Sequence, residues 1–318
     1  MQSNSRSRSL RLELPATSAN LGPAFDAAAI AFNLYLKITV EISEQNEISA
    51  TGRDVEICRR VENHLILETY RDVLTTEGKK PIPLSLRIHN EFPIGKGFGS
   101  SAAARVAGIA LAVHFGNLKW SDDRIVGEAS RREHHPDNAS ACWMGGLTVA
   151  RMETDVEAQV ACIKPKGKWP LLLAVPPEPL STEKARGVLP ATYSRADTVT
   201  NVQNSMLLLC AFTQGRPDLL RGALDDRIHQ PYRAPLCPLL PALQELAGEG
   251  EVLGVALSGA GPSVLVFLEP KASQKKAAAR IANHLRKNKL AGELISTEIT
   301  LRGARDLMKP AIAQASPR

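Results

Sequence analysis

The chain has 318 residues, of which 44% are hydrophobic and 23% charged, a composition typical of folded globular proteins that excludes a disordered chain. This length exceeds what one hydrophobic core usually organises, so two domains are expected. The formal net charge of +6 is concentrated in residues 271–318, which carry eleven Lys or Arg against three Asp or Glu. Since no aromatic residues interleave this basic stretch, it indicates a solvated helix face or a homodimer surface and does not favour nucleic-acid binding.

Cysteine usage and hydropathy favour a cytoplasmic protein without a membrane span. The five cysteines are scattered, with no C-x-x-C pair and no histidine cluster at ligand spacing, which disfavours a disulfide framework or a structural zinc. No apolar run approaches the roughly 20 residues that cross a bilayer. Residues 1–10 are rich in Ser and Arg and are expected to form a disordered tail, because strand-like sequence begins at about Leu10.

The first half of the chain shows strand patterns with a few helices. Residues 34–42 alternate apolar and polar side chains and predict a half-buried strand, and residues 84–88 repeat this pattern. Residues 65–74 have the spacing of a helix. Residues 102–115 are rich in alanine and apolar nearly all round, so they predict a buried helix.

The second half begins where the sequence KPKGKWP (164–170) interrupts these patterns and marks a domain boundary. A buried strand is predicted at 171–176 and a helix at 199–214. The remaining predicted elements are strands at 252–257 and 263–268 joined by SGAGP, a helix at 273–288 and a strand at 294–301. This alternation predicts a two-layer α+β domain, so the expected domains are 11–165 and 170–318.

The strongest local signal is the stretch PIGKGFGSSAA at residues 93–103. Glycines at 95, 97 and 99 allow backbone conformations closed to other residues and a close approach to a ligand. The helix that follows starts at Ser100 and Ser101, and the free amide N–H groups and dipole of a helix start attract an anion.

This loop matches neither common nucleotide fingerprint. It lacks the G-K-[ST] ending of a P-loop, and no βαβ unit with a ribose-binding acid surrounds it. The serine hydroxyls suit a phosphate oxygen or Mg²⁺. A glycine-rich turn capped by serine, without any ligand, is the alternative interpretation of the loop taken alone.

Three separated segments together resemble the three motifs of the GHMP small-molecule kinases. They are PATSANLGPAFD at 15–26, the loop at 93–103 and LSGAGP at 257–262, in this order along the chain. The first segment is similar to the P-A-S-S-A-N-L-G-P-G-F-D of homoserine kinases, and HPDN at 135–138 followed by two glycines is similar to the same group. The resemblance covers residues 11 to about 302.

The resemblance implies the α+β GHMP kinase fold, with an N-terminal domain like ribosomal protein S5 domain 2, a C-terminal ferredoxin-like domain, and the site between them. It also implies ATP- and Mg²⁺-dependent phosphorylation of L-homoserine to O-phospho-L-homoserine in threonine biosynthesis. The residues expected to bind the ATP phosphates are Pro93, Ile94, Gly95, Lys96, Gly97, Phe98, Gly99, Ser100, Ser101, Ala102 and Ala103, with Gly259 and Gly261 from the third motif.

For the metal, the family uses a loop serine and a glutamate on the next helix. These positions correspond to Ser101, or Ser100, and to Glu128. Glu133 is the alternative, because the distance from Glu128 to His135 is one residue shorter than in some family members. A hydroxyl and a carboxylate suit Mg²⁺, which prefers oxygen ligands.

For the acceptor, the family uses the first motif, the H-x-D-N segment and two arginines. The corresponding residues are Asn20, Asp26, His135, Asp137, Asn138, Arg186 and Arg233. A guanidinium binds an α-carboxylate with two hydrogen bonds, and Asp26 and Asn20 can accept from an ammonium. Stabilisation of the turn by Asn20 and Asp26, and a packed core role for His135, stay open as alternatives.

The resemblance leaves two candidates for the route of the acceptor proton. Mevalonate and galactose kinases have an aspartate base where homoserine kinases have an asparagine, here Asn138. We expect that no carboxylate takes the proton directly and that it moves toward the phosphate during transfer, with Asp137 as the alternative base.

The sequence also departs from the family pattern in ways that leave other functions open. Ala24 and Phe98 replace a usual glycine and leucine, and ASACWM follows Asn138, so Trp143 and Met144 are expected to reshape the pocket wall. The alternatives are a GHMP kinase for a different alcohol and a non-catalytic binding protein of the same fold. The retained loop glycines and carboxylates favour an enzyme.

Overall fold

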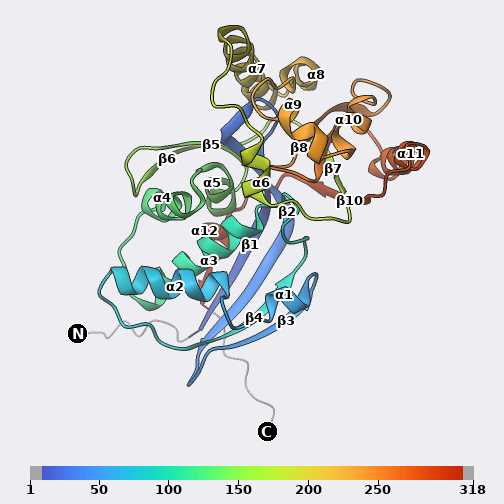
Figure 1. Cartoon of the computed structure of the whole chain (residues 1–318). Helices are drawn as coiled ribbons and strands as arrows, with labels where there is room; N and C mark the ends of the chain where they lie inside the picture. Colours follow the sequence, from blue (N-terminus) through green and yellow to red (C-terminus); the bar gives the residue numbers. More distant parts are fainter. Residues whose placement is uncertain (1–8, 311–318) are drawn as a thin grey trace.

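The structure is a computed structural model that describes residues 9–310 and contains two β-sheets (Figure 1). The first sheet has the order β11-β1-β2-β4-β3, with β5 paired to β2 and β6 paired to β5; the second has the order β10-β7-β9-β8. Residues 1–8 of the expected tail lie outside the described part, and Ser9 and Leu10, expected in that tail, belong to strand β1.

The first sheet is antiparallel except for β3, which runs parallel to β4. The predicted strand at 34–42 is the second half of the long strand β2, where apolar side chains such as Ile38 and Val40 are buried. The strands are β1 (Ser9–Asn20), β2 (Ala24–Ile42), β3 (Glu47–Gly52), β4 (Leu84–Asn90), β5 (Leu147–Met152), β6 (Ala158–Ile163) and β11 (Lys309–Pro310).

Helices α2 and α3 lie side by side against the first sheet (Figure 1). The predicted buried helix at 102–115 is confirmed as α3, which begins two residues earlier. Its small residues let α2 approach closely, since a Cβ at Gly108 would lie 2.5 Å from the carbonyl oxygen of Ile66. The helices of this half are α1 (Val55–Cys58), α2 (Leu65–Thr76), α3 (Ser100–Phe115), α4 (Asp122–Glu133) and α5 (Asp137–Met144).

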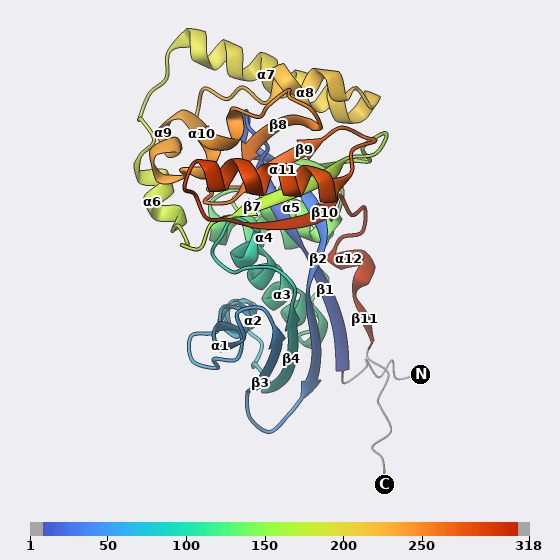
Figure 2. The ribbon, with the colours of Figure 1, turned by 90° about the vertical axis from the view of Figure 1, so that its right-hand side faces the viewer.

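The second sheet is buried on both faces. Leu171 and Leu173 join a core that includes Phe212 of α7 (Arg195–Gln214) and extends into the first sheet. Leu172 belongs to a separate cluster with α10 (Leu239–Gln244) and α11 (Gln274–Lys287). Figure 2 shows α11 in front of β7 and β10. The strands are β7 (Pro170–Val175), β8 (Val252–Leu257), β9 (Val264–Leu268) and β10 (Glu293–Glu298).

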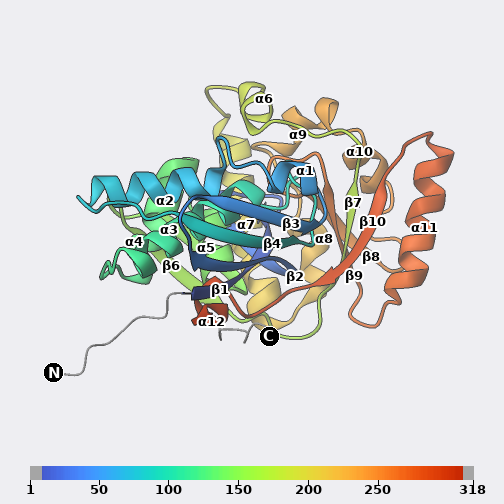
Figure 3. The ribbon, with the colours of Figure 1, turned by 90° about the horizontal axis from the view of Figure 1, so that it is seen from below.

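The helices of the second half confirm the predictions at 199–214 and 273–288 to within four residues. They are α6 (Thr182–Gly187), α7 (Arg195–Gln214), α8 (Leu220–Ala223), α9 (Gln230–Arg233), α10 (Leu239–Gln244), α11 (Gln274–Lys287) and α12 (Ala304–Leu307), with 3₁₀ turns η1 (Pro217–Leu219) and η2 (Ala234–Leu236). Seen from below, α11 and the helices α2 to α4 lie at opposite ends of the molecule (Figure 3). Between residues 9 and 310, no helix combines the length and the apolar character that a membrane span requires.

The last described residues return to the first sheet. The Thr300 amide donates to the Ala31 carbonyl at 3.0 Å, and Leu10 pairs with Pro310 in β11. The domain division at 11–165 and 170–318 stays a prediction, and the connection between Ile163 and Pro170 fits it. Residues 299–310, however, pack on the first unit, because their backbone groups complete its hydrogen bonds.

Candidate active site

The loop between β4 and α3 has the conformation that its three glycines allow. Gly95, Gly97 and Gly99 all have positive φ, and Gly99 is the left-handed N-cap of α3. A Cβ at Gly97 would lie 2.3 Å from the carbonyl oxygen of Ser258, and one at Gly99 would lie 1.9 Å from Thr17 Oγ1. Since both distances are far below van der Waals contact, glycine is required where the loop packs on two other segments.

Those two segments are the first and third motifs. The Thr17 amide donates to the Phe98 carbonyl at 3.0 Å, and Ser258 Oγ donates to the Gly97 carbonyl at 2.6 Å. Asn20 Nδ2 donates to the Gly259 carbonyl at 2.8 Å. Three stretches of chain that are far apart in the sequence therefore form one continuous wall.

This wall lines a cavity of about 120 Å³ between the two sheets. The predicted site residues that line it are Asn20, Asp26, Gly95, Gly97, Gly99, Ser100, Ser101, Ala102, His135, Asp137, Asn138, Arg186, Arg233, Gly259 and Gly261, together with Glu133. The cavity has the helix start of α3 at one side and the charged residues of the acceptor prediction at the other.

Four predicted phosphate-loop residues have structural surroundings instead. Pro93, Phe98 and Ala103 are buried and do not line the cavity, so their side chains support the loop. Lys96 Nζ donates to the carbonyls of Pro176 at 3.1 Å and Pro177 at 2.7 Å, which fastens the loop to the segment after β7.

A second cavity of about 500 Å³ adjoins the loop and was not predicted from the sequence. It shares Gly95, Ser100 and Ser101 with the first cavity, and Ile94 also lines it. Its remaining wall comes from β2, β4, the helices α1 and α2 and the connection between them, and includes Leu36, Ile57, Asn63, His64, Ile66 and Ile88. No motif or spacing in the connection 59–64 signals this role, because the fold alone brings it to the loop.

Glu133, rather than Glu128, is the carboxylate beside the loop. Ser101 Oγ donates to Glu133 Oε1 at 2.6 Å, and Arg105 of α3 also donates to that oxygen. Glu128 is buried elsewhere and accepts from Arg131 and Arg132. Five residues of helix turn through about 500°, so the two carboxylates lie on different faces of α4.

The pKa of Glu128 fits a structural ion pair. Burial alone would raise this pKa, but the hydrogen bonds and charges of Arg131 and Arg132 outweigh burial and lower it. Glu128 therefore stabilises α4 with its two arginine partners. Glu133 is the last residue of α4 and stands two residues before His135, where the chain turns toward the cavity.

The acceptor side of the cavity contains a bidentate ion pair. Arg186 of α6 donates to both carboxylate oxygens of Asp26, at 2.7 and 3.0 Å. The Asp26 amide donates to Asn20 Oδ1 at 2.9 Å, so Asn20 shapes this turn as well as lining the cavity. The ring of Phe25 lies under two guanidinium groups. Its centroid is 5.6 Å from Arg186 Cζ and 5.3 Å from Arg233 Cζ.

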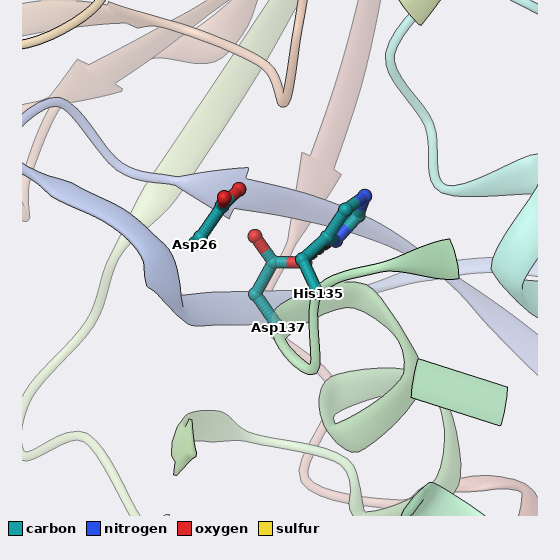
Figure 4. Close-up of side chains that lie close together, drawn as sticks. All are labelled: Asp26, His135 and Asp137. Atoms are coloured by element: carbon teal, nitrogen blue, oxygen red, sulfur yellow. Dashed lines mark hydrogen bonds and ion pairs between the residues drawn. The ribbon is translucent and has the colours of Figure 1, made fainter. Parts of the chain in front are cut away.

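His135 and Asp137 form a hydrogen-bonded pair opposite Asp26 (Figure 4). Burial lowers the pKa of His135, but the hydrogen bond and charge of Asp137 outweigh burial and raise it above the usual value. The three side chains offer ligand atoms within 4.8 Å of one another. Because Arg186 already pairs with Asp26 and His135 with Asp137, we interpret this cluster as a polar recognition surface rather than a metal centre.

Asn138 has a fixed orientation at the junction of loop and acceptor side. Thr17 Oγ1 donates to the side-chain oxygen Asn138 Oδ1 at 2.7 Å, and the backbone N–H of Asn138 donates to Asp137 Oδ1 at 2.6 Å. With its oxygen engaged, the side chain has its Nδ2 protons left as donors. An amide in this state can donate to a substrate oxygen but cannot take a proton.

Comparison with known proteins places this geometry in a family. The profile of the GHMP kinases N terminal domain matches residues 64–146, and that of the GHMP kinases C terminal region matches residues 208–287. A homoserine kinase from Solibacter usitatus is 42% identical over 258 residues, which cover 81% of this chain and 84% of that protein. The chain belongs to the GHMP kinase family.

Further relatives extend this match to nearly the whole chain. A homoserine kinase from Deinococcus radiodurans is 35% identical over 94% of this chain and 97% of its own length. The crystal structure of homoserine kinase from Cytophaga hutchinsonii, at 21% identity, matches with a TM-score of 0.80 over 97% of this chain and 99% of that chain. The predicted α+β GHMP kinase fold is thereby confirmed, and membership of the family implies the use of ATP.

Trp143 lies away from the pocket wall, although the sequence predicted that it would reshape it. Its indole N–H donates to Asp122 Oδ1 at the start of α4 at 2.7 Å, and its side chain is buried. Neither Trp143 nor Met144 lines the cavity. The unusual ASACWM sequence therefore fills the core behind the site.

Proposed function

We propose that this GHMP kinase transfers the γ-phosphoryl group of ATP to the side-chain hydroxyl of L-homoserine, giving O-phospho-L-homoserine in threonine biosynthesis. The relatives of 34–42% identity over most of the chain support this acceptor. The observation that carries the proposal is the single cavity in which a helix start faces a cluster of Asp, His and Arg side chains. We further propose a cytoplasmic location, and a homodimer stays a prediction.

The two adjoining cavities fit the two parts of ATP. The larger one, with its apolar wall, fits the nucleoside, and the glycine loop fits the phosphates. The shared residues Gly95, Ser100 and Ser101 lie where the two parts would join. Backbone N–H groups at the start of α3 bind the phosphate charge, because they have no partner within the helix.

We assign a Mg²⁺ site to Ser101 and Glu133 in place of the predicted Ser101 and Glu128. The two oxygens lie 2.6 Å apart beside the phosphate loop, and both residues line the cavity, which Glu128 does not. Glu133 also pairs with Arg105, so its carboxylate would be shared between that arginine and the ion. One hydroxyl and one carboxylate are a fitting donor set for a hard cation that takes its other ligands from phosphate and water. When bound, the ion would neutralise phosphate charge during transfer.

The acceptor side recognises an amino acid through opposite charges. Arg233 presents its guanidinium to the cavity and binds the α-carboxylate, and Asp26 with Asn20 faces the ammonium. Arg186 holds Asp26 in a fixed position with two hydrogen bonds. This arrangement orients the side-chain hydroxyl of the acceptor toward the phosphate loop.

No carboxylate in the cavity is placed as a free base for that hydroxyl. Asp137 Oδ1 accepts from His135 and from the backbone amide of Asn138, which commits this carboxylate to orienting its neighbours; its Oδ2 is the one remaining acceptor and makes Asp137 the alternative base that the Asp137→Asn variant tests. The proton therefore leaves the hydroxyl during transfer and goes to the phosphate oxygens, and catalysis rests on positioning and charge.

The proposed function is tested by ADP release with L-homoserine, mevalonate and several sugars as acceptors. We expect release with homoserine alone, and O-phosphohomoserine as the product in a mass spectrum. Turnover of another alcohol but not of homoserine would refute the acceptor. ADP release with none of them would favour a binding protein.

A further inference from the structure

His229 lies behind the acceptor cavity and contacts its buried arginine. His229 is fully buried and precedes the one-turn helix α9, which ends at Arg233. Its Nδ1 lies 3.2 Å from an Nη1 of Arg233, and its Nε2 lies 2.8 Å from the carbonyl oxygen of Gly22. No motif or spacing in the sequence points to this histidine.

These two contacts fix the tautomer of the imidazole. A guanidinium has only donors, so Nδ1 must accept from Arg233; a carbonyl has only lone pairs, so Nε2 must carry the proton. Asp226 Oδ2 lies 3.5 Å from Nε2 and favours the same tautomer. A cationic His229 would direct an N–H group at the Arg233 cation.

Burial and the neighbouring Arg233 keep the His229 imidazole neutral. Asp226, Arg233 and Asp26 face it, and burial is the largest influence on its pKa. Burial together with the charge of Arg233 outweighs the two carboxylates and lowers the pKa of His229 to about 4. The imidazole is therefore an uncharged acceptor throughout the neutral range.

Arg233 and Arg186 differ in whether an anionic partner neutralises their charge. Arg186 forms a bidentate ion pair with Asp26, so its charge is neutralised within the protein. Arg233 Nε donates to the Ala185 carbonyl at 2.9 Å and Nη1 to His229, both neutral, and within residues 9–310 it forms no ion pair. Arg233 is thus oriented by two uncharged acceptors and retains its positive charge.

Neighbouring contacts hold His229 rigidly in this position. The Asp226 carboxylate accepts from the amides of Ile228, His229 and Gln230, at 2.9, 2.9 and 2.6 Å. Phe25 stacks on the imidazole at 5.2 Å. Through Gly22 and Phe25, the same histidine also contacts the turn that contains Asp26.

We propose that His229 is a positioning residue that orients Arg233 for the acceptor carboxylate without neutralising its charge, and so sets the specificity for amino-acid alcohols. This inference rests on the proposed function. An acidic residue in the same place would pair with Arg233 and cancel the charge that attracts the carboxylate. The neutral imidazole accepts the hydrogen bond through Nδ1 and leaves the positive charge of Arg233 available for the carboxylate.

Two variants separate the two contacts of His229. In His229→Asn the amide oxygen can replace Nδ1 and still accept from Arg233, whereas in His229→Gln the amide nitrogen replaces Nε2 and reaches Gly22. The acceptors to compare are L-homoserine and 3-aminopropan-1-ol, which is homoserine without its carboxylate. Thermal unfolding of each variant shows whether the fold is retained.

For His229→Gln, losing a hydrogen bond to a charged group predicts a KM for homoserine raised roughly 10- to 100-fold. The KM for ATP and the kcat/KM for 3-aminopropan-1-ol should change little, and His229→Asn should recover most of the loss. The proposal would be overturned if His229→Gln lowered kcat/KM equally for both acceptors. It would also be overturned if His229→Asn had a higher KM for homoserine than His229→Gln.

A measurement on the unaltered protein covers variants that do not fold. Nitrogen-15 shifts of its histidines at neutral pH should show His229 neutral and protonated at Nε2. A cationic or Nδ1-protonated ring would refute the proposal. This measurement does not depend on turnover. If the enzyme failed to phosphorylate homoserine, the proposed function would be refuted, but the tautomer of His229 would still be determined.

Discussion

Replacing Gly99 by alanine should damage the site far more than its backbone strain alone can. Gly99 has φ 67°, and a residue with a side chain loses about 1–2 kcal/mol in this left-handed region. The added Cβ would lie 1.9 Å from Thr17 Oγ1, whereas ordinary contact begins at 3.4 Å. One of the two groups must therefore move by about 1.5 Å.

Either movement disturbs the reaction geometry. If Thr17 rotates away, it loses its hydrogen bond to Asn138, which is worth about 1 kcal/mol. If the loop shifts, the proposed phosphate site moves, and a displacement of about 1 Å can cost roughly 100-fold in rate. Gly99→Ala should therefore lose about 2–3 kcal/mol of unfolding free energy and about 100-fold in kcat/KM.

Gly78→Ala is the matched control. Gly78 has φ 66°, nearly the same as Gly99, but nothing lies within 4 Å of an added Cβ. It should lose only the backbone strain of about 1–2 kcal/mol and keep full activity. Urea unfolding and the ADP-release assay measure both variants. Equal activity of Gly99→Ala and Gly78→Ala would refute the steric reasoning, and Thr17→Ala should reduce the added cost of Gly99→Ala in a double-mutant cycle.

Three further predictions concern the metal, the proton and pH. Glu133→Gln should raise the Mg²⁺ concentration for half-maximal activity at least about tenfold and Glu128→Gln should not, and a Mg²⁺ titration showing the reverse would return the metal to Glu128. Asp137→Asn should change kcat by less than about 100-fold; a fall of several orders of magnitude at unchanged KM for homoserine, with Asn138→Ala nearly silent, would make Asp137 the base. Because the folded protein raises the pKa of His135, its contribution to stability should be complete below about pH 6.5 and decline as pH rises through the raised value. In urea unfolding measured from about pH 5.5 to 9, His135→Gln should abolish that decline. If the variant and the unaltered protein had the same pH dependence of stability, His135 would be excluded as its source.

Local periodicity explains which elements were predictable. The alternation at 34–42 and the apolar run at 102–115 each reflect burial within one element, and both appear in the structure as a strand and a helix. The glycine loop was predictable for a similar reason, because glycine at 95, 97 and 99 indicates a backbone with positive φ, which few other residues adopt.

Features that depend on how elements pack were not predictable. The choice between Glu128 and Glu133 depends on how α4 is rotated against α3, which no single-helix pattern records. The larger cavity depends on the irregular connection before α2, and the return of residues 299–310 to the first sheet depends on the Ala31 carbonyl, which accepts from Thr300, and on the edge of β1. Each of these requires the position of a second element.

A crystal structure with a non-hydrolysable ATP analogue tests most directly whether the glycine loop binds the nucleotide. We expect the phosphates on the backbone amides of residues 95–101 and the base in the cavity beside His64 and Asn63. A nucleotide bound elsewhere, with no phosphate at the start of α3, would contradict the proposed site and the kinase mechanism built on it.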